Sequence, residues 1–349
     1  MKILRFLLFP VAIIYDLITS IRNILFDNGI FKQHEFSLPV IAVGNLSVGG
    51  TGKSPQIEYL IRLLIRKFKT ATLSRGYKRK TKGFQLLDTH HNVCSVGDEP
   101  MQFYKKFKEI SVAVDSNRVH GINTLIHKVK PQVILLDDAF QHRKVKASLY
   151  ILLTKYSDLY VDDFVLPSGN LRESSRGAER ADIIVVTKCP SNLTTKKQED
   201  IKRKLTISEN QRLFFSAISY GDKIYSERRN RNLKSLKESK IVLVTGIASP
   251  KSLLQFLDSK SINYIHLNFP DHHNFSESDL SKIRTTFSSL TSKEKIILTT
   301  EKDYMRLENR LDELYYLPIE NKFLNREKEF NTTIMQHINS KLDKNSVTS

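Results

Sequence analysis

The sequence predicts an α/β protein with two lobes, each built on a mostly parallel sheet that helices cover on both faces. Short apolar runs of strand-like composition alternate with runs whose apolar residues recur at helical spacing, and parallel sheets produce this alternation. A charged, polar stretch within 213–238 interrupts the alternation, which then resumes. At 349 residues the chain is long enough for two domains with a substantial core.

The larger predicted lobe covers residues 31–212 and the smaller one residues 239–340. Ligands are expected at the carboxyl ends of their parallel strands. Predicted strands occupy 39–45, 70–76, 110–115, 132–139, 148–155, 181–188, 240–248, 262–269 and 295–300, and predicted helices 55–68, 116–130 and 194–205, with others beginning near 250, 277 and 326. The remaining segments are a membrane-associated helix within 1–30, an extended linker at 213–238 and a polar tail at 341–349.

A glycine-rich turn joins the strand at 39–45 to the helix at 55–68. Its residues are Gly49, Gly50, Thr51, Gly52, Lys53 and Ser54. In such a turn the backbone amides point at an anion, the lysine reaches the β- and γ-phosphates of a nucleotide, and the serine hydroxyl ligates Mg²⁺. Ser47 stands where the motif usually has its first glycine. A turn without a ligand is the alternative, but the strand-to-helix context favours a P-loop, and hence a P-loop NTPase-like α/β/α sandwich.

Two adjacent aspartates, Asp137 and Asp138, end the apolar strand that begins at Val133. In a P-loop fold the carboxylate that holds the metal emerges there, close to Ser54. Neighbouring strand residues point to opposite faces, so one carboxylate is expected to bind Mg²⁺ directly and the other through water. A solvated pair at a strand end is the alternative.

Candidates for proton transfer are Asp98 and the pair His272 and His273. Asp98 begins a predicted helix, where a carboxylate either caps the helix or accepts a proton from an attacking hydroxyl, and spacing alone favours neither. The histidines follow Asp271 in the second lobe. They either bind a metal, for which the sequence offers no matching ligand cluster, or supply a partner for proton transfer.

Two loops carry charged side chains at the expected ligand-binding edge. Arg75 opens a basic run after a strand, and Arg172 and Glu173 are the polar tips of a loop at 166–174. Charge runs are often only solvated faces, but at this edge they suit a phosphate or an acidic headgroup.

Composition narrows the class of partner. The formal net charge is +18, from 55 basic and 37 acidic side chains, which suits nucleic acid, an anionic membrane or a phosphorylated substrate. The two cysteines, Cys94 and Cys189, lie far apart in sequence. They argue against a disulfide framework and fit a reducing compartment.

The N-terminal segment is apolar with basic residues at its edge. Its ten uncharged residues from Phe6 to Tyr15 are fewer than the roughly 20 that a spanning helix needs, and no convincing cleavage site follows. A helix that lies in a membrane surface is favoured over one packed against the protein's own core.

Two other classes of P-loop protein are disfavoured. A GTPase needs an aspartate where this chain has Pro190 after Thr187-Lys188-Cys189, and the related stretch at 300–303 has the wrong spacing. A nucleic-acid-binding ATPase would use the charge directly. However, the sequence has no tryptophan and no recognisable RNA-binding or helix-turn-helix motif, so no nucleic-acid partner is expected.

An ordered set of motifs carries a family resemblance. The stretches GNLSVGGTGKSP, LSRGY, VGDEP, LLDDAFQHR, LPSGNLRE, VVTKCP, DHHNFS and TEKDYMRL follow one another along the chain. Together they resemble the tetraacyldisaccharide 4'-kinases, the lipid A 4'-kinases of Gram-negative bacteria, from the N-terminal helix to about residue 307. The serine at position 47 fits this family, whose loop has the form G-N-x-x-x-G-G-x-G-K.

The resemblance implies transfer of the γ-phosphate of ATP, with Mg²⁺, to the 4'-hydroxyl of an acylated glucosamine disaccharide 1-phosphate. It implies that Asp98 is the catalytic base and His272 its partner. Lys53 and Ser54 match the P-loop ligands, and Asp137 and Asp138 match the metal-binding pair.

The same resemblance implies that Arg172 and Glu173 line the site, which lies between two α/β/α lobes. The N-terminal helix would contact the cytoplasmic face of the inner membrane, and we expect a monomer. If Asp98 and His272 lie on different lobes, their pairing would require the lobes to close.

Overall fold

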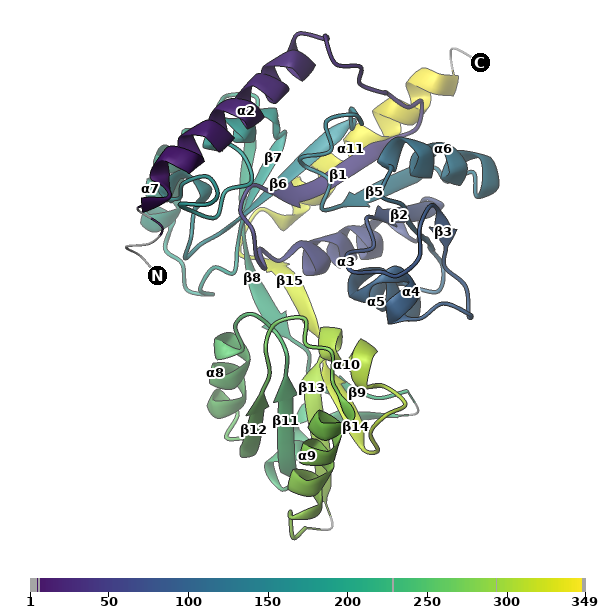
Figure 1. Ribbon diagram of the computed structural model, residues 1–349, viewed down its shortest axis with the longest axis vertical. Coiled ribbons are helices and arrows are strands. Elements are labelled where there is room, and N and C mark those ends of the chain that lie inside the picture. The colour runs from purple at the N-terminus through teal and green to yellow at the C-terminus, as the bar shows by residue number, and fades with distance from the viewer. Residues whose placement is uncertain (1–4, 6, 228, 293, 347–349) are drawn as a thin grey trace.

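The computed structural model describes residues 5, 7–227, 229–292 and 294–346. Over these residues two sheets form two lobes, the larger above the smaller in Figure 1. The large sheet has nine strands in the order β15-β8-β7-β6-β1-β5-β2-β4-β3, and the small sheet has six in the order β10-β9-β14-β13-β11-β12. The predicted α/β class with mostly parallel sheets and an N-terminal apolar helix is confirmed.

The bounds of the elements are as follows. The large sheet contains β1 (Val40–Asn45), β2 (Thr70–Ser74), β3 (Gln85–Leu86), β4 (Ser111–Val114), β5 (Val133–Asp137), β6 (Leu149–Lys155), β7 (Ile183–Thr187), β8 (Arg212–Tyr220) and β15 (Ile319–Phe323). Around it lie α2 (Phe9–Asp27), α3 (Lys53–Leu64), α4 (Val93–Val96), α5 (Asp98–Lys106), α6 (Arg118–Lys128), α7 (Thr195–Leu205) and α11 (Glu327–Ser346). The smaller lobe contains β9 (Lys223–Tyr225), β10 (Asn230–Asn232), β11 (Lys240–Thr245), β12 (Tyr264–Asn268), β13 (Lys295–Thr300) and β14 (Leu314–Leu317), with α8 (Lys251–Ser259), α9 (Glu277–Ser288) and α10 (Glu301–Leu307).

The central strands of the large sheet run parallel, so their carboxyl ends share one edge. Val43 of β1 is in register with Asp137 of β5 and with Ile151 of β6. Every residue of β1 and β5 is buried, which explains why both read as continuous apolar runs. The chain segments that follow β1, β2, β5 and β7 therefore gather at the edge where ligands are expected.

The predicted division of the chain needs a correction. The segment at 213–238, predicted as a linker, is mostly regular structure. The apolar strand β8 belongs to the large sheet, and β9 and β10 belong to the small one.

The second lobe is also not continuous to residue 340. Strand β15 pairs with β8, and α11 buries Phe330, Ile334 and Ile338 in the core of the large lobe. The predicted tail at 341–349 is helical as far as Ser346, and residues 347–349 lie outside the described residues.

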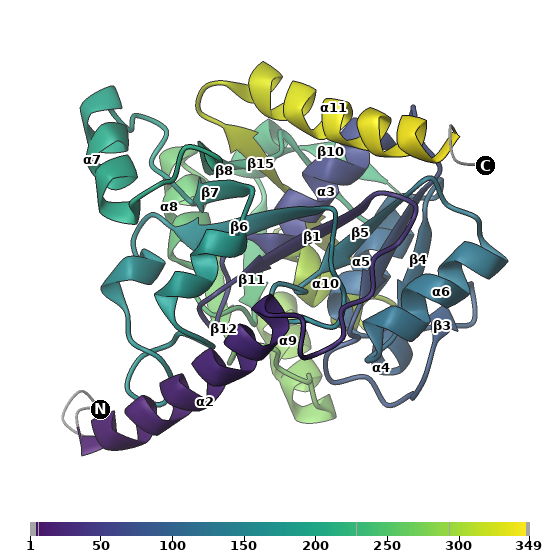
Figure 2. The same cartoon turned by 90° about the horizontal axis from the view of Figure 1, so that it is seen from above.

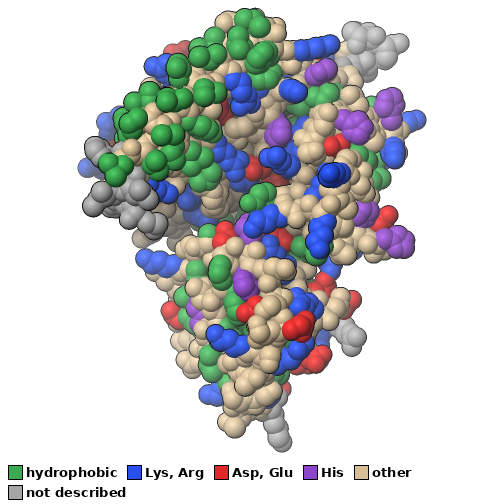
Figure 3. All heavy atoms as spheres, viewed as in Figure 1, with side chains coloured by type: hydrophobic (Ala, Val, Ile, Leu, Met, Phe, Trp, Pro, Cys, Tyr) green, Lys and Arg blue, Asp and Glu red, His purple; other side chains and the backbone are tan. Residues whose placement is uncertain are grey.

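Helix α2 lies on the outside of the large lobe, on the opposite side of the sheet from α11 (Figure 2). Only Ala12, Thr19 and Phe26 of this helix are buried. Its outer side is a broad apolar surface, visible at the upper left of Figure 3. Over the described residues, α2 is the one helix long and apolar enough to cross a membrane, although near an N-terminus this is weak evidence.

Candidate active site

The P-loop turns between β1 and α3 and places Lys53 as the first residue of the helix. Gly49 and Gly52 have φ angles of 100° and 89°, which glycine adopts without the strain that a Cβ would cause. Lys53 Nζ donates a hydrogen bond to Asn45 Oδ1 at 3.0 Å and lies 3.6 Å from Asp138 Oδ1. The ammonium group is therefore fixed at the carboxyl ends of β1 and β5, beside the amides of the loop.

Asp137 and Asp138 have different surroundings. Asp137 ends β5, is buried, and its Oδ1 has no hydrogen-bond partner among the described residues. Burial, together with the charges of Asp138 and Glu99, raises the pKa of Asp137 to about 7. Burial also acts to raise the pKa of Asp138, but the charges of Lys53 and Arg172 outweigh it and hold that pKa below its usual range.

These residues fit a magnesium ion. Carboxylate and hydroxyl oxygens are the protein ligands that Mg²⁺ takes, usually one or two of them together with water. A buried carboxylate oxygen without a partner is unfavourable, and a cation would satisfy the one on Asp137. Ser54 stands in the first turn of α3, next to the lysine that would contact the phosphates.

Asp98 and His272 come from different lobes and meet at the junction between them. Asp98 is the first residue of α5 and is 5% exposed, while His272 follows β12 in the small lobe. Asp98 Oδ2 lies 3.2 Å from His272 Nδ1. The backbone N–H of His272 donates to the carbonyl oxygen of Gly246, which fixes the residue in a left-handed conformation with a φ of 57°.

Both ring nitrogens of His272 contact charged side chains. His272 Nε2 lies 2.8 Å from Lys302 Nζ, and a lysine ammonium group can only donate hydrogen bonds. Nε2 therefore accepts from Lys302. Nδ1 faces both Asp98 Oδ2 and, at 3.1 Å, Arg306 Nη2.

Arg306 holds the Asp98 carboxylate from the other side. Its Nε donates to Asp98 Oδ1 at 2.8 Å and its Nη2 donates to Asp98 Oδ2, a bidentate pairing. Burial acts to raise the pKa of Asp98, but the hydrogen bonds from His272 and Arg306 and the charge of Arg306 lower it overall. Asp98 is consequently a carboxylate at neutral pH.

Lys302 and Arg306 were missed as individual residues by sequence reasoning, which used TEKDYMRL only as a motif. They lie four positions apart on α10, and this spacing places both side chains on one face of a helix. That spacing was a signal in the sequence. Their partners, 30 and 208 residues away in the chain, could not be read from it.

His273 is turned away from its neighbour. Its Nε2 lies 2.9 Å from Asp279 Oδ2 and its ring stacks on Phe269 with a centroid separation of 5.0 Å. The histidine pair is thus divided between one residue at the lobe junction and one that supports the start of α9.

The loop at 166–174 contributes two charged residues with different positions. Arg172 Nη1 donates to Asp138 Oδ1 at 2.8 Å, at the strand edge that holds the P-loop lysine. Glu173, predicted as a polar tip, is instead 2% exposed. It accepts hydrogen bonds from Arg180, Gln141 and Asn23 of α2, because the loop turns this side chain inward under the helix. Arg75 remains exposed at the end of β2.

One electrostatic link joins the two halves of the site. Glu99 follows Asp98 on α5, and its charge contributes to the raised pKa of Asp137. Tyr77, which follows β2, packs edge-on against the His272 ring at a centroid separation of 5.7 Å, and β2 pairs with β5. The lobe junction and the aspartate pair therefore lie at the same edge of the large sheet. A P-loop with a carboxylate pair at the end of a neighbouring strand, together with a buried carboxylate–histidine pair, is typical of a P-loop phosphotransferase.

Comparison with known proteins narrows this class. A family model described as tetraacyldisaccharide-1-P 4'-kinase (LpxK) matches residues 4–339. The tetraacyldisaccharide 4'-kinase of Flavobacterium johnsoniae is 55% identical over 98% of this chain and 100% of its own length, and that of Bacteroides fragilis strain YCH46 is 45% identical over 95% and 92%. The crystal structure of "apo" form LpxK from Aquifex aeolicus in complex with ATP matches with a TM-score of 0.78 and 30% identity, over 96% of this chain and 99% of that one. This chain belongs to the tetraacyldisaccharide 4'-kinase family.

Proposed function

We propose that this chain transfers the γ-phosphate of ATP to the 4'-hydroxyl of an acylated disaccharide 1-phosphate, and that Asp98 accepts the proton of that hydroxyl. The kinase activity, in lipid A biosynthesis, follows from the family. One structural observation supports the assignment of the base: Asp98 is a buried carboxylate held from the other lobe by His272 and Arg306.

In this reaction the acceptor oxygen forms a bond to the γ-phosphorus while the bond to the bridging oxygen of ADP breaks. The hydroxyl proton passes to Asp98. A carboxylate of low pKa suffices, because the transition state of phosphoryl transfer is loose and catalysis depends mostly on positioning and charge stabilisation. His272 and Arg306 orient the carboxylate, and Lys53 stabilises the charge on the phosphates.

Mg²⁺ would be held by Asp137 and Ser54, with Asp138 acting through water, and would neutralise phosphate charge. Asp138 also pairs with Arg172 and lies close to Lys53, so it keeps both cations at the edge of the sheet. In this arrangement Asp137 would bind the metal directly, while Asp138 would mainly position Lys53 and Arg172.

A lipid acceptor requires the enzyme to work at a membrane. The exposed apolar side of α2, which includes Ile14, Leu17 and Ile18, suits insertion into the interface. Arg22 and Asn23 of the same helix bind Gln141 and Glu173, so the helix stays attached to the lobe that carries the P-loop. We place the enzyme on the cytoplasmic face of the inner membrane, where ATP is available. We also propose that it acts as a monomer, because one chain supplies both Asp98 and His272.

The pairing of Asp98 with His272 also supports the proposed role of lobe closure. Separation of the lobes would break this contact and the bidentate contact with Arg306. A closed site would exclude water and limit ATP hydrolysis.

A label-transfer assay tests this function. The purified chain receives γ-labelled ATP, Mg²⁺ and the disaccharide 1-phosphate lipid in neutral detergent micelles, beside an Asp98→Asn variant. Label in the 4'-phosphate of the lipid with the wild type, and its near absence with the variant, is the expected result. Label in the lipid with both proteins would remove Asp98 from its role, and release of free phosphate alone would contradict the kinase activity.

A further inference from the structure

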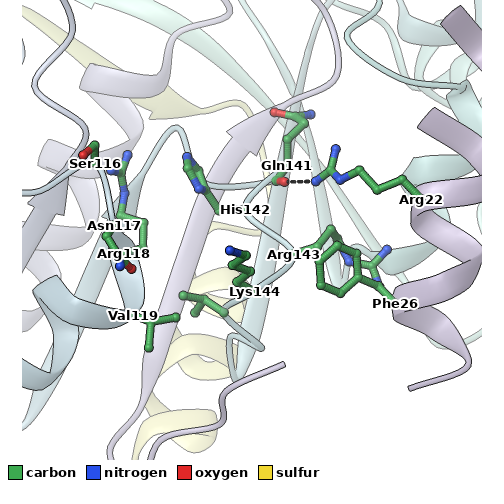
Figure 4. Close-up of a pocket in the computed structure, with 11 residues that line it drawn as sticks. Arg22, Phe26, Ser116, Asn117, Arg118, Val119, Gln141, His142, Arg143 and Lys144 are labelled. Carbon is green, nitrogen blue, oxygen red and sulfur yellow. Dashed lines mark hydrogen bonds between the residues drawn. The ribbon is translucent and has the colours of Figure 1, made fainter. Parts of the chain in front are cut away.

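Side chains hold backbone groups near the candidate site in both lobes. In the large lobe, Arg22 of α2 donates a hydrogen bond to the carbonyl oxygen of Gln141 at 2.6 Å (Figure 4). In the small lobe, the carboxyl group of Asp303 accepts the backbone N–H of Gly246 through Oδ2 at 2.8 Å. Asp303 belongs to the TEKDYMRL stretch and is 0% exposed, so its carboxyl group serves the protein interior rather than the solvent.

Asp303 is fixed at the start of α10. The hydroxyl of Thr300 caps this helix by accepting the backbone N–H of Asp303 at 3.1 Å, and it donates to Asp303 Oδ2 at 2.7 Å. The carboxyl group is thereby held against Gly246, which directly follows β11. Burial raises the pKa of Asp303, but Oδ2 can accept hydrogen bonds from both neighbours whether or not the acid is ionised. The backbone of Gly246 therefore requires an acceptor oxygen rather than a negative charge.

Gly246 in turn holds His272. Its carbonyl oxygen accepts the backbone N–H of His272 at 3.1 Å, and His272 has a φ of 57°. A residue with a side chain keeps this left-handed conformation only where its surroundings hold it there. A Cβ on Gly246 would lie 2.9 Å from Asp303 Oδ1 and 3.3 Å from the carbonyl oxygen of Pro270. Glycine is therefore needed for α10 and the turn after β12 to approach each other here.

Three residues of α10 thus act on the pairing of Asp98 with His272. Lys302 contacts His272 Nε2, and Arg306 binds the Asp98 carboxylate. Asp303 lies between them in the sequence and reaches the backbone of His272 through the glycine. Because α10 also packs against α5, a shift of the turn that carries the histidine would misalign its ring with a carboxylate that stays in place.

We propose that Asp303 is a positioning residue for phosphoryl transfer. Through Gly246 it fixes the backbone of His272, and with it the ring that contacts Asp98. The inference rests on the proposed function, because the position of this ring matters only if Asp98 accepts the hydroxyl proton. Loss of Asp303 should impair the chemical step and not nucleotide binding, since the P-loop belongs to the other lobe. A side chain that only stabilised the start of α10 would affect folding in a way that does not depend on His272.

The test is a double-mutant cycle on Asp303 and His272, with label transfer from ATP to the disaccharide 1-phosphate lipid as the readout. Asp303→Leu keeps a side chain of similar shape and removes the acceptor oxygen. We expect its kcat to fall roughly 10- to 100-fold, with the KM for ATP unchanged. In the His272→Gln background the same change should lower kcat by no more than about threefold, because the ring that Asp303 positions is gone.

Three further variants separate positioning from folding. Asp303→Asn keeps an acceptor oxygen for Gly246 and should retain kcat within about fivefold of the wild type. Gly246→Ala places a Cβ against Asp303 Oδ1 and should lower kcat roughly 10-fold, but only where His272 is present, so it tests the same contact if Asp303→Leu does not fold. The matched control is Thr299→Val, which removes a buried hydrogen bond to the carbonyl oxygen of Val244 in the same lobe and should keep the wild-type kcat.

Losses of equal size with and without His272 would overturn the proposal, as would an Asp303→Asn enzyme as slow as Asp303→Leu. A wild-type kcat in an Asp303→Leu protein that denaturant unfolding shows to be folded would also overturn it. The wild type alone tests the proposed function. If it labels no lipid, that function fails and the inference fails with it, whereas a labelled lipid with equal losses in the cycle overturns the inference alone.

Discussion

Asp98 and His272 are 174 residues apart in the sequence, yet Asp98 Oδ2 lies 3.2 Å from His272 Nδ1. The contact joins the first residue of α5 in the large lobe to the turn after β12 in the small lobe. Lys302 and Arg306, both on α10, hold the two members of the pair in place. The small lobe, which supplies no part of the P-loop, therefore contributes to the candidate site.

Replacing Arg306 by Met should change the pH dependence of catalysis. The substitution removes a hydrogen bond and a positive charge that lower the pKa of Asp98, while the burial that raises this pKa remains. We expect the acid limb of the profile of kcat/KM against pH to move to higher pH, and kcat to fall by roughly 10- to 100-fold through loss of orientation. Arg310→Met is the matched control, because Arg310 binds Glu277 and the carbonyl of Phe275. An acid limb that stays in place would show that Asp98 does not control it.

Replacing Glu173 by Ala should destabilise the large lobe. Glu173 is buried and receives two hydrogen bonds from Arg180, so the substitution leaves the Arg180 charge unpaired beneath α2. We expect a loss of about 3–5 kcal/mol in the free energy of unfolding by denaturant. Asp200→Ala, which breaks an exposed pair with Arg203, should cost no more than about 1 kcal/mol. Equal costs would mean that Glu173 does not anchor the helix.

Replacing Glu301 by Gln should alter how stability depends on pH. Glu301 is buried and pairs with Lys106 at 2.6 Å, and burial with the charge of Glu58 raises its pKa to about 7. Because the folded pKa lies above the unfolded value, this group contributes stability that is present below pH 4.5 and is lost as the pH rises through about 7. The effect should amount to roughly 1–3 kcal/mol between pH 5 and 8, measured by unfolding at intervals of one pH unit. Glu301→Gln should flatten this part of the curve, and an unchanged curve would refute the assignment.

Replacing Ile18 by Glu should weaken binding to membranes. Ile18 is 60% exposed on the apolar side of α2, so the change costs the protein no core packing. Loss of a large apolar contact with lipid predicts roughly 10-fold or weaker binding in sedimentation with anionic vesicles. Ile265→Glu, at an exposed site on β12 that is 44% exposed, should bind vesicles like the wild type. Equal binding of both variants would remove α2 from the membrane contact.

The fold could be predicted from the sequence wherever local pattern determines structure. Buried strands such as β5 read as apolar runs, and α3 shows its apolar spacing through Ile57, Leu60, Ile61 and Leu64. The return of β15 and α11 to the large sheet could not be predicted, because it depends on pairing with β8 across a complete lobe. Local pattern contains no information about which edge a late strand will join.

The candidate site also contains some features that could be predicted from the sequence and others that could not. The P-loop and the aspartate pair at the end of β5 were predictable, because each is a short motif at a strand end. The inward position of Glu173 was not, because its partners Asn23 and Arg180 come from separate elements. The role of Arg306 also depends on a contact between lobes.

The most direct test is a double-mutant cycle on Asp98 and His272, with Asp98→Asn, His272→Gln and the combined variant assayed for label transfer into the lipid. Each single change should lower kcat by roughly 10²- to 10⁴-fold. Since the two residues act as one unit, the combined variant should be little slower than the slower single variant. Losses that multiply in the combined variant, or an Asp98→Asn enzyme that transfers label at the wild-type rate, would contradict the assignment of the pair as the proton acceptor and its partner.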